Sequence, residues 1–249
     1  MDLIFPHPPP LSSFAPPPEG TKLYIATPCY GQMVLSAYAE ALFDTQALLT
    51  ERGVPCRVGF HSSAAISQGR NIMVGRFMNT DCTHLIFIDA DMGWKPESVW
   101  RLLSAACLPD HEVVCGAYPM KTPPPHTLTV AFLPTPDASV ERHPVTGFWD
   151  IRAVGAGFLM MQRSVIERLF QLHPEKKITR DGALQEYAIF DYFIDSEGRY
   201  LGEDIGFCCL WREAGGQIWM DPECRLSHYG IYEYRAGTPR ECFRHRLIE

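Results

Sequence analysis

The chain has 249 residues, of which 46% are hydrophobic and 20% are charged, proportions that are ordinary for a globular protein with its own core. Its formal net charge of −7 argues against nucleic acid as the main partner, because phosphate backbones bind basic surfaces. The sequence has no run of 18 apolar residues and no signal-peptide pattern, so we expect no transmembrane segment.

The nine cysteines are scattered through apolar segments, and no C-x-x-C pair occurs among them. Small secreted domains, in contrast, space their cysteines as a disulfide framework. The pattern therefore predicts reduced, mostly buried thiols and a cytoplasmic location.

Residues 1–20 form a proline-rich N-terminal segment, with prolines at positions 6, 8, 9, 10, 16, 17 and 18. Proline lacks a backbone N–H group and has a fixed φ, so this segment cannot form a helix or a central strand. We predict an extended arm. Two interpretations of its role stay open, a flexible tail and a partner-binding arm.

Residues 21–117 alternate between short apolar runs and stretches with helical spacing of apolar residues. Ser67 is expected to cap the second of the helices. Repeated strand–helix units at this spacing predict a mainly parallel sheet flanked by helices. The expected elements are strands at 22–27, 56–60, 84–88 and 113–117 and helices at 33–52, 67–78 and 97–107.

Residues 118–150 interrupt this regularity with seven prolines and predict a loop-rich insertion, with a hairpin near 128–133. Regular elements return in residues 151–249. Strands are expected at 157–162, 187–194 and 217–220, and helices at 164–172 and 203–214. The fold class is therefore α/β, with a more mixed second half.

The two acids of Asp89-Ala90-Asp91 directly follow the apolar strand at 84–88. Ligands of open α/β sheets bind outside the carboxyl ends of the strands. Mg²⁺ and Mn²⁺ are held there by one or two carboxylates together with substrate phosphates. The pair therefore predicts a divalent metal site. The alternative is an ordinary turn, in which the acids bond nearby backbone N–H groups.

Two further segments are placed to bind a nucleotide. Thr27-Pro28-Cys29-Tyr30 ends the first strand, where a base can lie against Tyr30, although a simple strand-to-helix turn explains it as well. Arg70 belongs to a helix start whose free N–H groups suit a phosphate, and its guanidinium adds a permanent positive charge. A surface salt bridge is the alternative for Arg70.

Gly69-Arg70-Asn71, followed by the strand that ends in Asp89-Ala90-Asp91, resembles the nucleotide-sugar half of GT-A fold glycosyltransferases. The similarity is to the family 2 type and the related mannosyltransferase-like group. Val154-Gly-Ala-Gly-Phe158 resembles the strand beside the acceptor pocket of these enzymes, and Gly202-Glu203-Asp204 resembles their E-D motif. The resemblance covers most of residues 22–230. It implies a Rossmann-like sheet in a single catalytic domain, residues 21–249, with residues 21–117 as its nucleotide-sugar half.

The resemblance also implies roles for individual residues. Asp204 and Glu203 would lie at the acceptor hydroxyl, with Asp204 as general base, although retaining relatives require no such base. Asp89, Asp91 and His228 would hold Mn²⁺ or Mg²⁺, with Asp91 the better direct ligand. The nucleotide-sugar donor would meet Thr27, Pro28, Tyr30, Arg70, Asp89 and Ala90, and the acceptor would meet Gly155, Ala156 and Gly157.

Two residues outside these motifs complete the set. Lys121 follows the fourth strand, where it can neutralise a leaving diphosphate or simply be a solvated loop lysine. Trp149, next to Phe148, can stack on an acceptor sugar or pack in the core.

These patterns together predict a metal-dependent glycosyltransferase that moves a sugar from a nucleoside-diphosphate donor to an acceptor hydroxyl. The acceptor, whether carbohydrate, lipid or protein, stays open. A nucleotidyltransferase is an alternative, but it normally needs a basic, glycine-rich loop, and residues 27–32 have one glycine and no Lys or Arg. A non-catalytic nucleotide- or sugar-binding module is the third interpretation.

Overall fold

The computed structural model describes residues 15–122, 124, 126–135, 139–179 and 185–243. Its centre is a seven-stranded sheet in which five strands run parallel and β9 and β7 run antiparallel to them. The predicted α/β class, with a mainly parallel sheet and a mixed second half, is confirmed. In spatial order the strands are β2 (Cys56–Ser62), β1 (Leu23–Cys29), β3 (His84–Ile88), β9 (Phe158–Gln162), β5 (Val113–Cys115), β14 (Trp219–Met220) and β7 (Trp149–Asp150).

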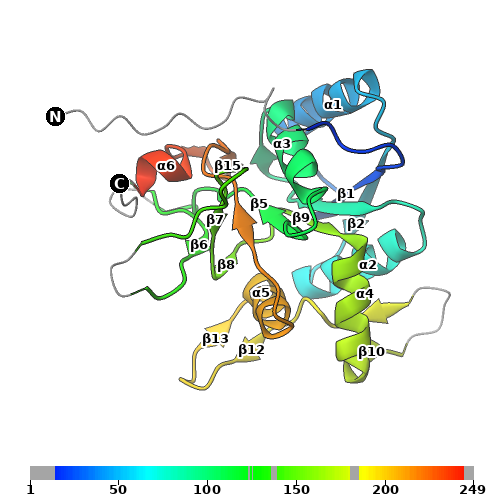
Figure 1. Cartoon of the computed structure of the whole chain (residues 1–249), viewed down its shortest axis with the longest axis vertical. Helices are drawn as coiled ribbons and strands as arrows, with labels where there is room; N and C mark the ends of the chain where they lie inside the picture. The colour runs from blue at the N-terminus through cyan, green and yellow to red at the C-terminus, as the bar shows by residue number, and fades with distance from the viewer. Residues whose placement is uncertain (1–14, 123, 125, 136–138, 180–184, 244–249) are drawn as a thin grey trace.

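Helices cover both faces of this sheet (Figure 1). Alternate side chains of β1 point to opposite faces, so that Leu23 and Ile25 pack in one core cluster and Tyr24 and Ala26 in the other. Both faces are apolar for this reason, as a strand between two helical layers requires. The first cluster lies under α1 (Ser36–Glu51) and α3 (Pro96–Ala106), and the second under α2 (Ile66–Met78), α4 (Arg163–Leu172) and α5 (Glu203–Glu213).

Short strands and turns connect these layers, and one small sheet bears directly on the site. In it, β15 (Ser227–Tyr229) pairs with both β4 (Met92–Gly93) and β16 (Glu233–Arg235). The remaining short elements are β6 (Val130–Ala131) with β8 (Ala153–Val154), β10 (Lys177–Ile178) with β11 (Glu186–Tyr187), β12 (Phe193–Ile194) with β13 (Tyr200–Leu201), η2 (Pro174–Lys176) and α6 (Pro239–Cys242).

Three local predictions were wrong. Residues 187–194 form no single strand, because β11 and β12 belong to different small sheets. The hairpin expected near 128–133 is absent there, because β6 pairs with β8. Ser67 is not a helix cap, since α2 begins one residue earlier and its N-terminal cap, Ala65, provides no side-chain hydrogen bond. Residues 1–14 of the expected proline-rich arm lie outside the described residues.

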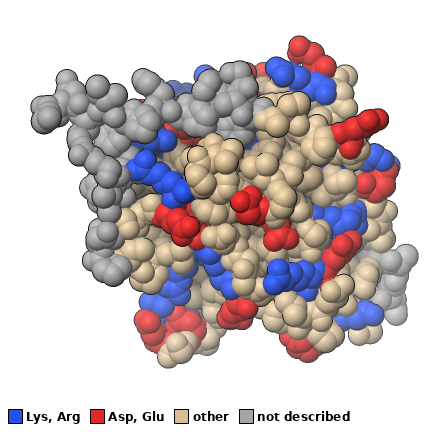
Figure 2. Space-filling view, viewed as in Figure 1, with Lys and Arg blue, Asp and Glu red and all other residues tan. Residues whose placement is uncertain are grey.

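Three further observations concern the thiols, the helices and the surface. All nine cysteines are free. Within the described ranges, no helix is both long and apolar enough to cross a bilayer. Figure 2 shows basic and acidic side chains interleaved on the face in view, with no large area of positive charge among the described residues.

Candidate functional site

The carboxyl ends of β1 and β3 form a cavity with a volume of about 300 Å³. Pro28 and Tyr30 line it from the β1 side, and Asp89, Ala90 and Asp91 from the β3 side. The Tyr30 ring is 78% exposed, so one of its faces is free for a planar ligand. Five residues that the sequence analysis assigned to a nucleotide sugar or its metal therefore share one cavity wall.

Asp91 is the centre of a charged cluster at this cavity. Its Oδ2 lies 2.5 Å from Nζ of Lys121, and its Oδ1 lies 3.4 Å from Nε2 of His228. The pairing of β4 with β15 produces this arrangement, because it aligns His228 with Met92, the residue after Asp91. Burial alone would raise the pKa of Asp91, but hydrogen bonds and charges from His228 and Lys121 lower it to about 2. Asp91 is therefore a carboxylate at neutral pH.

The protonation of His228 follows from its second partner. Nδ1 lies 2.9 Å from the carbonyl oxygen of Pro119, which can only accept a hydrogen bond, so Nδ1 carries the proton. Nε2 faces Asp91 Oδ1, and the low pKa of Asp91 corresponds to a second proton on this nitrogen, donated to the carboxylate. At this distance the two atoms need that proton or a metal cation between them. A backbone carbonyl on the other ring nitrogen is also the usual support for a metal-binding histidine.

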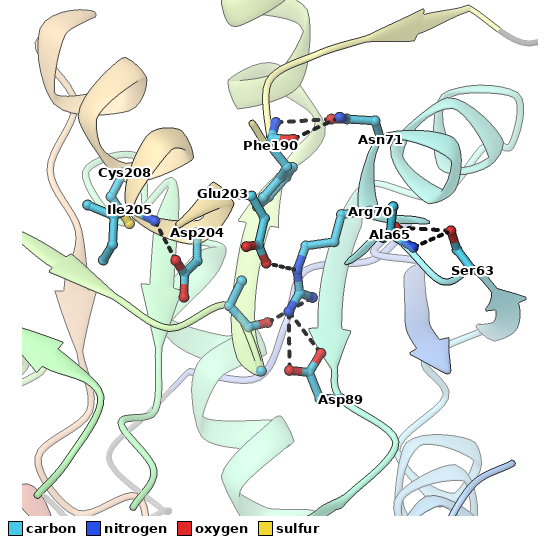
Figure 3. A network of polar contacts seen from close by, with 12 residues as sticks. Ser63, Ala65, Arg70, Asn71, Asp89, Phe190, Glu203, Asp204, Ile205 and Cys208 are labelled. Atoms are coloured by element: carbon cyan, nitrogen blue, oxygen red, sulfur yellow. Dashed lines mark hydrogen bonds and ion pairs between the residues drawn. The ribbon is translucent and has the colours of Figure 1, made fainter. Parts of the chain in front are cut away.

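Asp89 has a different partner, Arg70, toward which its carboxylate points in Figure 3. Nη2 of Arg70 donates to Asp89 Oδ2 at 3.1 Å and lies 3.0 Å from Oδ1, where the geometry gives no hydrogen bond. Burial raises the pKa of Asp89, while the charge of Arg70 opposes that shift. The buried Oδ1 therefore has no aligned donor among the described residues, and a ligand could satisfy it.

The position expected for Arg70, free at a helix start and aimed at a diphosphate, was wrong. Its side chain is 3% exposed, and it lies in the second turn of α2. Nε donates to Glu203 at 3.2 Å, and Nη1 reaches the carbonyl oxygen of Ala156 at 3.5 Å. Because its guanidinium contacts Asp89, Glu203 and the Ala156 carbonyl, Arg70 links the end of β3 to the second half of the chain from within the protein.

Asp204 follows Glu203 at the start of α5 and has a different environment. Its Oδ1 accepts a hydrogen bond from the Ile205 N–H at 2.8 Å, and it makes no bond to Arg70 among those found (Figure 3). Burial, followed by the charge of Glu203, raises the pKa of Asp204. A half-buried carboxylate with a raised pKa is suited to take a proton from a hydroxyl.

The glycines of the 154–158 motif allow a close packing of backbone against Tyr118. A Cβ at Gly155 would lie 2.4 Å from the Tyr118 hydroxyl oxygen, and a Cβ at Gly157 would lie 2.9 Å from Asp89 Oδ2. Gly155, Ala156 and Gly157 are all buried. These residues therefore help to position Asp89. Because all three are buried, none of them can contact an acceptor directly.

Two other predicted contacts are not available in this structure. Thr27 is fully buried, and its hydroxyl forms a hydrogen bond with that of Tyr38 instead of facing the cavity. Trp149 is fully buried in the core and cannot stack on a sugar. Its strand, β7, ends the sheet and is separated from β3 by three other strands.

Sequence reasoning missed Tyr118 and Pro119, which lie three and four residues after the end of β5. The Tyr118 hydroxyl oxygen accepts the Gly157 N–H at 3.1 Å, and the Pro119 carbonyl orients His228. Their neighbour Lys121 was recognised as a candidate from the sequence because its side chain is charged. A tyrosine in an apolar context and a backbone carbonyl carry no comparable signal.

Asp110, His111 and His143 form the only trio of possible metal ligands within 4.8 Å of one another in the described ranges. Hydrogen bonds explain why these three side chains lie so close together. Nδ1 of His143 accepts the N–H groups of Val145 and Thr146, so Nε2 carries the proton donated to Asp110 at 2.9 Å. A metal on Nε2 would move that proton to Nδ1, against two N–H donors. We interpret the trio as a hydrogen-bond network.

No protein-family model and no curated protein matches the chain. Similar solved structures include A197 from STIV, with a TM-score of 0.48 and 18% identity over 84% of this chain and 86% of that one. GalNAc-T7 with UDP, GalNAc and Mn²⁺ has a TM-score of 0.48 and 12% identity over 86% and 44%. For 4-diphosphocytidyl-2C-methyl-D-erythritol synthase from Anaerococcus prevotii the values are 0.42 and 7% over 94% and 97%.

This chain thus spans less than half the length of the GalNAc-T7 chain. All three TM-scores are below 0.5, which is too low to infer chemistry from these structures. The fold of this chain is therefore described by its own strand order, and its chemistry by its own side chains.

Proposed function

We propose that this protein is a metal-dependent glycosyltransferase that moves a sugar from a nucleoside-diphosphate donor to an acceptor hydroxyl. One observation carries the proposal. Asp91 Oδ1 and His228 Nε2 face each other at 3.4 Å at the wall of a cavity that Tyr30 and Asp89 also line. A cation position, an exposed aromatic ring and a nearby ammonium group are the three features that a nucleoside diphosphate requires.

Asp91 and His228 would hold the metal. One carboxylate and one imidazole suit Mn²⁺, with Mg²⁺ as the harder alternative. The ring orientation of His228, fixed by the Pro119 carbonyl, fits this assignment. A bound divalent cation would offset the negative charge of the departing nucleoside diphosphate. We assign Asp89 to the donor side, because its carboxylate is paired with Arg70 and one of its oxygens lacks a donor.

The remaining residues of the site would act on the donor directly. Tyr30 would stack on the base, with Pro28 and Ala90 as the floor of the same cavity. Lys121, which is partly exposed and bonded to Asp91, would move its ammonium group to a diphosphate oxygen. Because these positive charges lie where charge develops on the leaving group, they would lower the barrier electrostatically.

In an inverting reaction Asp204 would be the base. Its carboxylate would take the proton of the acceptor hydroxyl as the hydroxyl oxygen forms a bond to the anomeric carbon. The bond from that carbon to the diphosphate oxygen breaks in the same step, and its electron pair leaves with the nucleoside diphosphate. Glu203 would contribute indirectly, because its carboxylate is bonded to Arg70.

A nucleotide-sugar panel with Mn²⁺ tests the proposal, scored for donor binding and nucleoside-diphosphate release with and without chelator. We expect at least one donor to bind, and the chelator, Asp91→Asn and His228→Ala each to weaken its binding about tenfold or more. His173→Ala is the control, because the side-chain hydrogen bond found for His173 among the described residues is to Glu175, outside the cavity. The proposal fails if no donor binds, or if binding is indifferent to both the chelator and Asp91→Asn.

The same samples separate this reaction from nucleotidyl transfer. A nucleoside triphosphate and a sugar phosphate would then release inorganic pyrophosphate, which a coupled assay detects. We expect none, because residues 30–35, which follow β1, include no Lys or Arg to bind a triphosphate.

A further inference from the structure

The hairpin of β12 and β13 presents an aromatic face to solvent. Tyr200 is 70% exposed, Ile194 69% and Tyr192 38%. The rings of Tyr192 and Tyr200 are parallel, with 5.6 Å between their centroids and an angle of 1° between their planes. A two-stranded hairpin of this size has no core of its own in which to bury aromatic rings. Rings exposed together on such a hairpin indicate a binding surface.

The strand register explains why these three side chains lie together. Ile194 is directly opposite Tyr200, and Tyr192 is two residues before Ile194, so all three lie on one face. Phe193 has the opposite orientation, and its ring lies 3.6 Å from the position that a Cβ of Gly206 would occupy on α5. The hairpin therefore packs one face against α5 and leaves the aromatic face open.

The turn of the hairpin is held by one carboxylate. Asp195 Oδ1 accepts the N–H groups of Glu197 and Arg199, both at 2.9 Å, and Oδ2 accepts from Arg199 Nε at 2.7 Å. At the other end, the carbonyl oxygen of Asp191 lies so close to Gly206 that any Cβ there would meet it at 2.3 Å. Both ends are fixed, so the two rings are ordered before any ligand binds.

The hairpin directly precedes α5 in the chain, and Figure 1 shows β12 and β13 beside this helix. Tyr200 is four residues before Asp204. Burial raises the pKa of Tyr192, and the charge of Glu203, then of Tyr200 and Asp204, adds to that shift. Asp191 and Phe193 of the hairpin segment both lie against Gly206, in the first turn of α5 together with Glu203 and Asp204. Polar acceptors near the outer face of a stacked pair of rings match a sugar, which has an apolar C–H face and hydroxyl groups at its rim.

We propose that Tyr192 and Tyr200 form the platform for a saccharide acceptor, stacked so that a hydroxyl group reaches Asp204. This inference rests on the proposed function and names its acceptor class, carbohydrate. Carboxylates beside the rings disfavour a membrane surface, which is anionic and attracts basic groups. A saccharide also fits a surface of two rings, whereas stable protein interfaces need a far larger area.

Saccharide binding without donor tests the platform, by saturation-transfer NMR with a panel of neutral mono- and disaccharides. We expect a saccharide to bind, Tyr192→Ala and Tyr200→Ala each to weaken it about tenfold, and Tyr200→Phe to retain affinity within about threefold. Phe43→Ala is the matched control, because Phe43 on α1 is 69% exposed and outside the hairpin. It should bind as the wild type does.

Donor hydrolysis without acceptor, measured as nucleoside-diphosphate release into water, separates this inference from the proposed function. We expect Tyr200→Ala to keep that release within about twofold while its transfer to the saccharide falls about tenfold. If donor is hydrolysed but no saccharide binds, or if Phe43→Ala weakens binding as much as Tyr200→Ala, the platform is overturned. Transfer to a lipid or a peptide that Tyr200→Ala abolishes also overturns it.

Discussion

Tyr118 packs its ring against Gly157, and its hydroxyl oxygen accepts the Gly157 N–H at 3.1 Å. The same glycine accepts, through its carbonyl oxygen, the N–H of Asp89 at 3.1 Å. The end of β3, where the acids begin, is thereby tied to β9 and to the segment after β5. The position of these acids, Asp89 and Asp91, depends on a residue with no side chain.

Gly157→Ala tests this packing. A Cβ would lie 2.8 Å from Tyr118 Cζ and 2.9 Å from Asp89 Oδ2, so either the ring or the carboxylate must move. We expect a loss of about 1–3 kcal/mol in the free energy of unfolding, measured with urea, and weaker donor binding. Gly69→Ala is the control, because a Cβ there meets atoms only at 3.4 Å or beyond. Equal effects of the two variants would contradict the packing argument.

Arg70→Met tests the internal ion pairs. Removing the guanidinium leaves Asp89 and Glu203 without their common cation in a buried site. We expect the free energy of unfolding to fall by about 3–5 kcal/mol in urea titrations. Arg199→Ala removes a guanidinium from an exposed pair with Asp195 and should have a much smaller effect on stability. A small effect of Arg70→Met would mean that Arg70 contributes little to the fold.

Asp204→Asn and Glu203→Gln separate the base from its neighbour. Asn retains the acceptor for the Ile205 N–H, so we expect normal stability and donor binding, with turnover lowered about 10²- to 10⁴-fold. Glu203→Gln weakens the bond to Arg70 and should cost about 2 kcal/mol in the free energy of unfolding. The raised pKa of Asp204 adds a pH signature, in which turnover rises with pH through a value above the ordinary carboxyl range. Full turnover by Asp204→Asn would exclude the residue as the base.

The pH dependence of stability tests the network of Asp110, His111 and His143. Burial, reinforced by the charge of His143, lowers the pKa of His111 below its ordinary 6.5, against the pull of Asp110. The unfolded chain then binds more protons, so this contribution to stability is complete above about pH 6.5 and is lost as the pH falls toward the lower folded value. His111→Gln should flatten the decline in unfolding free energy between about pH 7 and pH 5.

His173→Gln provides the comparison for that slope, because His173 lies at the partly exposed end of α4. Its slope should equal that of the wild type. Any change in melting temperature that Zn²⁺ causes should be the same in the wild type and in His143→Gln, since the network already uses the histidine nitrogens. A zinc-dependent rise that His143→Gln removes would show a metal site instead.

The order of strands and helices in residues 21–117 followed from the sequence, because each element has a run of apolar residues with its own period. Asp91 and Asp89 were also found that way, since acids directly after a buried strand lie at a sheet edge. The predictions of a strand at 187–194 and of a hairpin near 128–133 were wrong for one reason. Short apolar runs in a loop-rich region pair according to which partner strand is near, and that is a tertiary property.

The meeting of Asp91 with His228, 137 positions later, was expected only from a resemblance, and the β4–β15 register produces it. The partners of Arg70, the buried hydroxyl of Thr27 and the burial of Trp149 had no signature in the sequence. Residue type sets which charges and rings a site can use. Whether each one faces the cavity or the core depends on packing between segments far apart in the chain, and only the tertiary structure decided that.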